Sequence, residues 1–472
     1  MEFKFNRKFS VSMYKNLKIK LGEMTFFKDF INDTRGDLYP VHEKSEDCVE
    51  FLERNQYTVA NGNVSRMVCQ FFPFATYEVT FVQDGGAVGF TFCLSDTYAH
   101  ITACDNLISY TCSEHHERKL IPDSFLQGEN TLIVTCRPGA FDIYWMINGK
   151  PEFLDTIYET AFDDSNQEII WKNSYAFLKV SGNATVKNVV SYIDNGISIA
   201  DIRPIKYENG DVIQENGRIY FTASIRMQEG SFQGVFSWLV GTAEFDLTGV
   251  VFYDCGDGKW RNYLAPTMLY DRNQNQWLVW VSSFEHKHIL AYASFKGDPR
   301  FGVNVIDVNI MEPATENHDI SEFLGLIRDE DPDLIYDEKN NRWILAICRI
   351  DPKTNSYVYT FFESDDPFKN FEYIGCGYSG AETGGSFVKM NGELYFVCGN
   401  DFKKTSEYRV YSKNGMVTAS FNYPDGGFRG WGSVFPVRMG SRIEYYWLTF
   451  DRHNGSSYNW SYGNLYCFEM TT

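Results

Sequence analysis

The chain has 472 residues and a formal net charge of −19, from 43 basic and 62 acidic side chains. This balance excludes a protein that uses a basic face to bind a nucleic-acid backbone or an anionic membrane surface. Hydrophobic residues make up 44% of the chain and aromatic residues 17%, so the chain can bury a core and is not an acidic disordered protein. The length predicts two domains.

The N-terminal residues 1–20 include basic side chains but lack the continuous apolar run of a secretory signal. No stretch of the sequence reaches the roughly 18 apolar residues that a membrane span needs. The eleven cysteines are scattered singly and form no CxxC pair, which predicts free thiols in a reducing compartment. We therefore expect a soluble, cytoplasmic protein without a membrane partner.

The first part of the chain is typical of an all-β protein. Short runs rich in Val, Ile, Phe, Tyr and Thr alternate with Gly, Asn and Asp turns, and helical periodicity is almost absent. Residues 76–95 and 130–150 each predict two strands with turns, and residues 184–194 predict a closing strand. We assign residues 25–194 to a two-sheet β-sandwich and residues 1–24 to an N-terminal extension.

From about residue 195 the pattern becomes a repeat of a strand, a polar turn and a second strand that opens on an aromatic residue. These aromatic residues follow one another at intervals of 51 to 66 residues, at Tyr220, Trp277, Trp343, Tyr395 and Tyr446. Five units at this period predict a five-bladed β-propeller over residues 195–472. The alternative is a second, irregular sandwich.

In a propeller the first strand of every blade lines the central channel, so residues at the starts of these strands converge at one mouth. In the third unit Asp331 precedes Pro332 and an apolar strand. In the fourth unit Glu382 stands at what we take as the corresponding place, and in the second unit Ala265-Pro266 stands there. The alternative for the acidic residues is that they only cap turns.

The first unit offers Asp201 and Asp211, with Glu208 between them. Three units thus predict a carboxylate at one mouth. Converging carboxylates suit glycoside hydrolysis, because one must be protonated to donate to the leaving oxygen while another is ionised. Repulsion between them in a partly desolvated mouth raises the pKa of the acid.

These residues resemble, in order and motif, the five-bladed propeller glycosidases of the family 43 type (arabinanases, arabinofuranosidases, xylosidases) and the family 32 type (invertases, levanases). Those families have Asp in blade one, Ala-Pro in blade two, Asp-Pro in blade three and Glu-Gly in blade four. The matching residues here are Asp201 or Asp211, Ala265-Pro266, Asp331-Pro332 and Glu382-Thr383-Gly384. The chain departs from the families in lacking Asp-Pro in blade one and in placing the sandwich before the propeller.

The resemblance implies that Glu382 is the general acid and that Asp331 tunes it or grips substrate hydroxyls. It implies a general base or nucleophile in blade one, for which we favour Asp201 over Asp211 because Ala-Asp-Ile-Arg-Pro resembles the Ala-Asp-Pro of the family. The implied activity is hydrolysis of terminal fructosyl or arabinosyl furanosides of short oligosaccharides. The alternatives are a pyranosidase such as a xylosidase and a non-catalytic carbohydrate-binding propeller.

Further residues near the predicted mouth are candidates for substrate binding. Arg203 and Arg328 flank the acids and either bind hydroxyls or keep carboxylates ionised. Trp431 either stacks on a sugar or packs in the core, and the other candidates are Trp260 and His318. The pairs His115-His116 and His286/His288 lack a third ligand at suitable spacing, so we expect no metal. We expect no cofactor either, since no phosphate-binding loop occurs.

The predicted N-terminal sandwich resembles concanavalin-like and laminin-G-like lectin folds, on the segment "LIVTCRPGAFDIYWMINGK". Such a module either binds carbohydrate or serves a structural role, including the interface of a homo-oligomer. We favour the structural role, because an intracellular enzyme has little use for anchoring to a polymer. The expected partner of the whole chain is an oligosaccharide substrate.

Overall fold

The structure is a computed structural model that describes residues 4–23, 31–32, 49–52, 56–95, 97–284, 288–311, 327–377, 380–400, 407–420, 428–451 and 464–471. In these ranges the chain forms strands β1 to β36, with only short helical turns such as α1 (Glu168–Trp171). None of the helices in these ranges is long or apolar enough to cross a bilayer. The predicted all-β class is confirmed.

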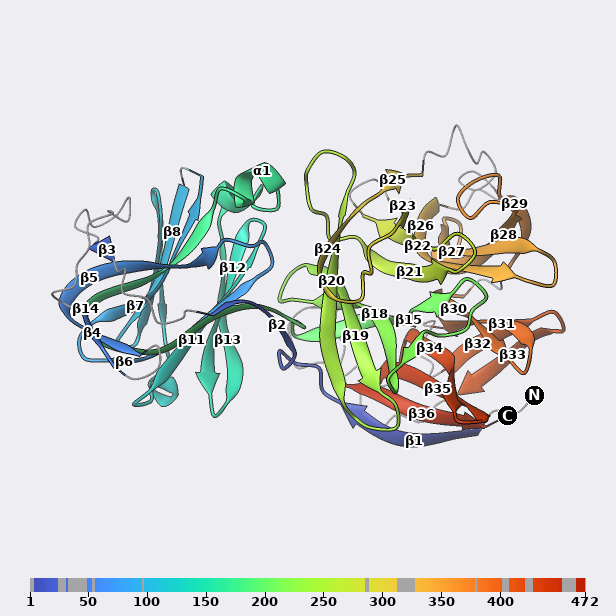
Figure 1. Ribbon diagram of the computed structural model, residues 1–472, viewed down its shortest axis with the longest axis horizontal. Helices are drawn as coiled ribbons and strands as arrows, with labels where there is room; N and C mark the ends of the chain where they lie inside the picture. The colour runs from blue at the N-terminus through green and yellow to red at the C-terminus, as the bar shows by residue number, and fades with distance from the viewer. Residues whose placement is uncertain are drawn as a thin grey trace. The chain divides into compact units, whose positions relative to one another are not determined.

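The chain divides into two compact units (Figure 1). Unit 1 takes in the chain up to Leu17, then Asn195–Asp257 and the chain from Arg261 onward, and unit 2 takes in Lys18–Asp194 and Gly258–Trp260. The predicted N-terminal extension 1–24 is wrong, because strand β1 (Lys4–Val11) pairs in unit 1 and strand β2 (Lys18–Glu23) pairs in unit 2. Both pairings are made with strands far away in the sequence, so a local reading does not find them.

Unit 1 is the predicted five-bladed β-propeller. Blade one is built on β15 (Ser198–Pro204), β18 (Arg218–Arg226), β19 (Ser231–Leu239) and β20 (Phe245–Asp254). Blade two is built on β21 (Leu264–Asp271), β22 (Gln276–Ser283), β23 (Ile289–Phe295) and β25 (Asn309–Ile310). Blade three is built on β26 (Ile327–Asp337), β27 (Arg342–Asp351), β28 (Ser356–Ser364) and β29 (Glu372–Cys376). Blade one also carries β17 (Gln214–Glu215) and β24 (Gly302–Asp307), and blade two carries β16 (Lys206–Tyr207).

Blade four consists of β30 (Glu382–Met390), β31 (Glu393–Asn400), β32 (Glu407–Ser412) and β33 (Gly415–Ser420). Blade five consists of β34 (Phe428–Met439), β35 (Arg442–Asp451), β36 (Leu465–Thr471) and β1. The first strand of each blade is the innermost, and these strands contact one another around the axis. The N-terminal β1 thus completes the C-terminal blade, a closure that joins the two ends of the propeller chain.

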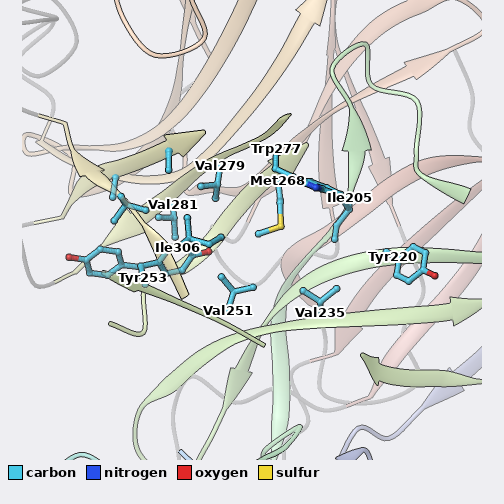
Figure 2. Close-up of a cluster of buried hydrophobic side chains, with 14 of the residues drawn as sticks. Ile205, Tyr220, Val235, Val251, Tyr253, Met268, Trp277, Val279, Val281 and Ile306 are labelled. Atoms are coloured by element: carbon cyan, nitrogen blue, oxygen red, sulfur yellow. The ribbon is translucent and has the colours of Figure 1, made fainter. Parts of the chain in front are cut away.

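Apolar side chains between neighbouring blades form the core of unit 1. Figure 2 shows one such cluster, in which Val235 and Val251 of blade one lie near Met268, Val279 and Val281 of blade two. Most of these strands are buried on both faces, which explains their long apolar runs in place of strict alternation. The five aromatic residues that mark the repeat lie on the second strands of the five blades, as predicted.

Unit 2 is one hydrogen-bonded sheet of thirteen strands, whose further members are β3 (Ile31–Asn32), β4 (Val49–Phe51), β5 (Tyr57–Gln70), β6 (Thr76–Gln83), β7 (Ala87–Leu94), β8 (Thr97–Cys104), β9 (Leu107–Cys112), β10 (His115–Leu120), β11 (Asn130–Arg137), β12 (Ala140–Ile147), β13 (Lys150–Tyr158) and β14 (Tyr175–Asp194). The first half of β14 pairs with β7 and its second half with β6.

Aromatic rings from both halves of this sheet meet. The centroid of the Phe92 ring on β7 lies 5.0 Å from the centroid of the Tyr77 ring on β6 and 5.3 Å from that of the Phe141 ring on β12. The two-sheet sandwich and its lectin-like family remain predictions.

Candidate active site

The innermost strands of blades one to four share an irregularity in their pairing with the second strand. The regular register is interrupted between Ala200 and Arg203, Leu264 and Thr267, Glu330 and Asp333, and Thr383 and Ser386. The first residue inside each interruption has a positive φ, at Asp201 (54°), Ala265 (52°), Asp331 (49°) and Gly384 (59°). Left-handed backbone is unfavourable for residues other than glycine, and such strain concentrates at functional sites. We call these four positions the bulge level.

Glu382 does not belong to the bulge level. It pairs with Asn400 two residues ahead of Gly384, so Gly384 is the blade-four equivalent of Asp331. The prediction that Glu382 corresponds in position to Asp331 is therefore wrong by two residues. The order of motifs shows which blade holds an acid, but only the hydrogen-bond ladder fixes its register.

Asp331 is buried and held by both neighbouring blades, four and two. Its Oδ2 accepts hydrogen bonds from Thr383 Oγ1 (3.2 Å) and from the Gly384 N–H (3.1 Å), and its own N–H donates to Ser282 Oγ (2.9 Å). Burial raises the pKa of Asp331, and the negative charge of Asp201 raises it further, against the opposing effect of the Arg203 charge. The pKa of Asp331 thus depends on the charge of Asp201, the bulge-level residue of blade one.

Asp201 is 4% exposed and accepts a hydrogen bond at Oδ2 from Arg226 Nη2 at 3.2 Å. Both residues belong to blade one, on β15 and β18. This charge-assisted contact within blade one orients the Asp201 carboxylate. Different residues thus position the two carboxylates: Arg226 binds Asp201, whereas Thr383 and Gly384 bind Asp331.

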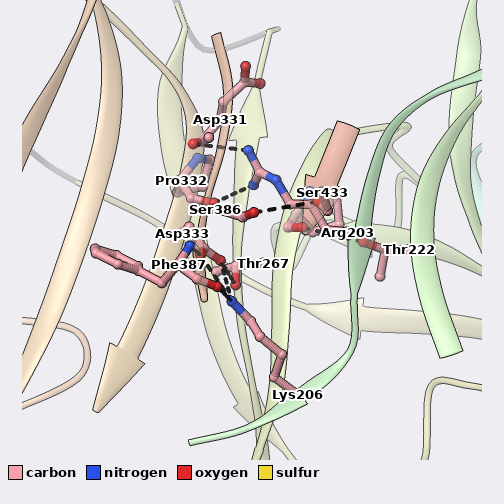
Figure 3. A network of polar contacts seen from close by, with 12 residues as sticks. Arg203, Lys206, Thr222, Thr267, Asp331, Pro332, Asp333, Ser386, Phe387 and Ser433 are labelled. Atoms are coloured by element: carbon pink, nitrogen blue, oxygen red, sulfur yellow. Dashed lines mark hydrogen bonds and ion pairs between the residues drawn. The ribbon is translucent and has the colours of Figure 1, made fainter. Parts of the chain in front are cut away.

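Just beyond the bulge level, polar side chains of all five blades meet on the axis (Figure 3). Arg203 donates to the backbone carbonyls of Ala265 (3.1 Å), Pro332 (2.5 Å) and Asp331 (3.3 Å). The predicted role of Arg203 in binding sugar hydroxyls is therefore not supported, because its terminal nitrogens tie blades one, two and three together. Arg203 does influence a carboxylate as predicted, because its charge lowers the pKa of Asp331 and so opposes the effect of burial.

Lys206 and Asp333 form a buried ion pair at the centre of this network. Lys206 Nζ lies 3.2 and 3.0 Å from the two oxygens of Asp333, which also accepts hydrogen bonds from Thr267 Oγ1 (2.6 Å) and the Phe387 N–H (2.5 Å). We call Arg203, Lys206, Thr267, Asp333, Ser386 and Ser433 the axial network. The sequence reasoning missed Asp333, although a third aspartate in the run Asp329 to Asp333 was visible in the sequence.

Glu382 is fully buried and all its contacts are within the protein. Oε2 accepts the Tyr359 N–H at 3.0 Å, and Oε1 accepts from Arg409 Nη1 at 2.7 Å and from the Tyr411 hydroxyl. Gly377 packs directly over the carboxylate, since a Cβ there would come within 2.3 Å of Oε2. Burial raises the pKa of Glu382, while these three donors oppose the rise.

Glu330, which the sequence reasoning passed over, lies beside Asp331 on β26. Burial raises its pKa to about 8, with a further contribution from the charges of Asp331 and Asp201. His288 Nδ1 lies 2.9 Å from Glu330 Oε1 without the alignment of a hydrogen bond. A glutamate next to two aspartates in the run Arg-Asp-Glu-Asp-Pro-Asp was the available signal.

Asp211 and Glu208 lie near the other end of the inner strands. Glu208 is ion-paired with Arg272 at 2.6 Å, and its N–H donates to the carbonyl of Tyr270. Asp211 is exposed and accepts a hydrogen bond from Asn209 Nδ2 at 3.1 Å. Ala265 and Tyr270 stand near opposite ends of β21, about 16 Å apart at the usual rise of a strand. The geometry therefore favours Asp201 over Asp211.

The remaining predicted binding residues have different surroundings. The Trp260 ring packs against Trp171 (4.6 Å) and Phe72 (5.4 Å) in an aromatic cluster of unit 2, which contradicts its predicted place at the mouth. Arg328 is exposed, and its charge lowers the pKa of Glu330. His318 and the Trp431 side chain lie outside the described residues. Among the described residues, acidic, His and Cys side chains form no group suited to a metal ion.

A cavity of about 810 Å³ lies between blades three and four, away from the bulge level. It is lined by residues at the far ends of the inner strands, such as Asp337 and Lys389. Tyr411 is the residue that links it to Glu382, because this side chain lines the cavity and donates to the Glu382 carboxylate.

No protein-family model and no curated protein matches this sequence. Solved structures do match the chain. A thermostable family-43 glycoside hydrolase is 15% identical over 58% of this chain and 88% of its own, with a TM-score of 0.39. An inulosucrase from Halalkalicoccus jeotgali bound to kestose is 14% identical over 56% and 78%, with a TM-score of 0.40. A family 117 glycoside hydrolase from Zobellia galactanivorans is 12% identical over 58% and 84%, with a TM-score of 0.41.

Proposed function

We propose that this chain is a glycoside hydrolase and that its active site is the mouth of the propeller at the bulge level. The observation that carries the proposal is the pair Asp201 and Asp331. The two carboxylates stand at equivalent strained positions of blades one and three, both are buried, and the charge of one raises the pKa of the other. Two of the three solved structures named above are glycoside hydrolases, but the proposal rests on this chain's own residues.

In this mechanism Asp201 acts on the anomeric carbon, either directly or through a water molecule that it deprotonates. Asp331 grips the substrate and holds negative charge next to the developing positive charge on the sugar ring. A neighbouring carboxylic acid donates its proton to the leaving oxygen. A pair of neighbouring carboxylates is suited to this division of roles, because burial and the charge of Asp201 raise the pKa of Asp331.

The proposed substrates are short oligosaccharides with a terminal fructosyl or arabinosyl furanoside. The axial network supports attack on terminal sugars, since Arg203 and the Lys206–Asp333 pair occupy the axis immediately beyond the bulge level. An axis filled at this point supports binding of the end of a sugar chain and disfavours binding of a chain that passes through the channel. The choice of furanosides rests on the resemblance in motif order, and a pyranosidase such as a xylosidase is the alternative.

The test is an activity panel of nitrophenyl furanosides and pyranosides, sucrose and inulo-oligosaccharides. We expect the wild type to hydrolyse at least one furanoside and the Asp331→Asn and Asp201→Asn variants to lose that activity. The matched control is Asp211→Asn, an exposed aspartate of the same propeller, which should keep it. The anomer released, followed by NMR, shows whether Asp201 acts as base or nucleophile.

Two outcomes would overturn the proposal. Full activity of Asp331→Asn would remove the carboxylate pair from the mechanism. A wild type that hydrolyses no member of the panel but binds the sugars in calorimetry would show a carbohydrate-binding propeller instead of an enzyme.

A further inference from the structure

Glycoside hydrolysis needs a carboxylic acid whose proton can reach the leaving oxygen. Glu382, the acid implied by the family resemblance, has both oxygens engaged by Tyr359, Arg409 and Tyr411. Its side chain is 0% exposed, and Arg409 holds it in an ion pair at 2.7 Å. A substrate oxygen would have to displace one of these donors to receive a proton from this group.

Glu330 offers what Glu382 lacks. Its side chain is 15% exposed, so a substrate atom can approach it. It precedes Asp331 and lies at the edge of the register interruption in blade three, where Glu330 pairs with Cys348 and regular pairing resumes only at Asp333. Its charge interacts with those of Asp331 and Asp201, which places it with the two carboxylates of the bulge level.

We propose that Glu330, and not Glu382, is the catalytic acid of this chain, and that Glu382 is a structural residue that joins blades three and four. The inference rests on the proposed glycosidase function. In the step it describes, the glycosidic C–O bond breaks, its electron pair stays on the leaving oxygen, and that oxygen takes the Glu330 proton and departs as an alcohol. Water supplies the new oxygen on the anomeric carbon, and its proton passes to Asp201 and then, through solvent, restores Glu330.

The surroundings of Glu330 keep its proton on at neutral pH. Among the described residues, the charged or titratable groups that interact with it are Arg328, Asp329 and Asp331 on its own strand, Asp201 on β15, His288 between β22 and β23, Cys348 on β27 and Tyr357 on β28. Three of them are acids that disfavour a further negative charge. Arg328 opposes this effect, and the charge of Asp329 is itself paired with Arg349 at 2.8 Å. Burial and Arg328 lower the pKa of His288, so the contact with Glu330 is not an ion pair that would hold the carboxylate ionised.

The decisive experiment compares substrates whose leaving groups need or do not need a proton. We expect Glu330→Gln to lose about 10²-fold or more in kcat/KM on an unactivated oligosaccharide, the usual size of a general-acid contribution. On the dinitrophenyl glycoside of the same sugar, whose leaving group departs without protonation, the variant should stay within about tenfold of the wild type. A purely structural residue would lower both rates alike.

The pH profile gives a second readout. In the wild type the basic limb of kcat/KM on the oligosaccharide should fall with a midpoint near the Glu330 pKa of about 8, and Glu330→Gln should lack this limb. Glu330→Asp should restore part of the activity together with a basic limb. The matched control Glu382→Gln should keep the limb and show no dependence on leaving group, and Tyr411→Phe serves the same purpose if Glu382→Gln does not fold.

Other results would overturn the proposal for Glu330, and they distinguish it from the glycosidase function. If Glu382→Gln shows the leaving-group dependence and Glu330→Gln does not, the proposal for Glu330 is overturned while the glycosidase function stands. If the wild type hydrolyses nothing, the glycosidase function fails, and the acid role fails with it. Infrared spectroscopy without substrate tests the protonated state independently of activity. If the spectrum of the wild type minus that of Glu330→Gln shows no carboxylic C=O band at pH 7, the proposal is contradicted.

Discussion

Two levels of the propeller axis, separated by two residues along β26, use buried carboxylates in opposite ways. At the bulge level, burial raises the pKa of Asp331, and the charge of another carboxylate, Asp201, raises it further. In the axial network, Asp333 is matched by the Lys206 cation and by the donors of Thr267 and Phe387. A buried charge is structural where opposite charge and hydrogen bonds compensate it, and is available for chemistry where they do not.

The largest effect should come from the bulge level. Asp331→Asn should lower kcat/KM about 10³-fold, which corresponds to about 4 kcal/mol of transition-state stabilisation. Its stability should not fall, since the amide no longer carries a charge that burial and Asp201 disfavour. Activity on the best panel substrate and urea unfolding measure the two quantities. If Asp331→Asn lowers stability but not activity, Asp331 is a structural residue and the bulge level does not differ from the axial network in this way.

The axial network should respond in the opposite way. Lys206→Met leaves Asp333 buried without its cation and should lower the free energy of unfolding by about 3 kcal/mol. The double variant Lys206→Met/Asp333→Leu removes both charges and should recover part of that loss. Chemical denaturation measures both. If the double variant is less stable than the single one, the ion pair is not the main contribution of these residues.

At the bulge level, Glu330 should make the free energy of unfolding depend on pH. Its pKa in the folded protein, about 8, lies above the ordinary value of 4.5, so the folded state binds the proton more tightly than the unfolded state. The stability of the wild type should therefore decrease as the pH rises from about 4.5 to 8. Glu330→Gln should be more stable than the wild type by about 4 kcal/mol at pH 8 and nearly equal to it near pH 4.5. Thermal unfolding across this range would contradict the assignment if the two curves stayed parallel.

The smallest effect is expected at the far end of the inner strands. Asp211 is exposed and near Asn209, so Asp211→Asn should change stability by no more than about 0.5 kcal/mol. Its kcat/KM should match that of the wild type. Parallel assays with Asp201→Asn provide the comparison, and equal losses in the two variants would place the site at the wrong end of the channel.

Much of the fold could be predicted from the sequence, because the blade pattern is local. The spacing of Tyr220, Trp277, Trp343, Tyr395 and Tyr446 reflects one hairpin in each blade, and each hairpin forms between residues close in sequence. The closure of blade five was not predictable in this way. Strand β1 pairs with β36 across nearly the whole chain, and no local pattern marks that pairing.

The candidate site divides along the same line. By itself the sequence determined which blades carry acids, since Asp201 and Asp331 occupy the starts of their strands. The tertiary structure decided which acids share a level, because register depends on hydrogen bonds between strands, and it placed Gly384 where Glu382 was expected. It also decided which acid is buried completely and which is accessible. The burial of both acids and the donors that engage Glu382 come from other strands, whereas Arg328, Asp329 and Asp331 stand next to Glu330 on its own strand.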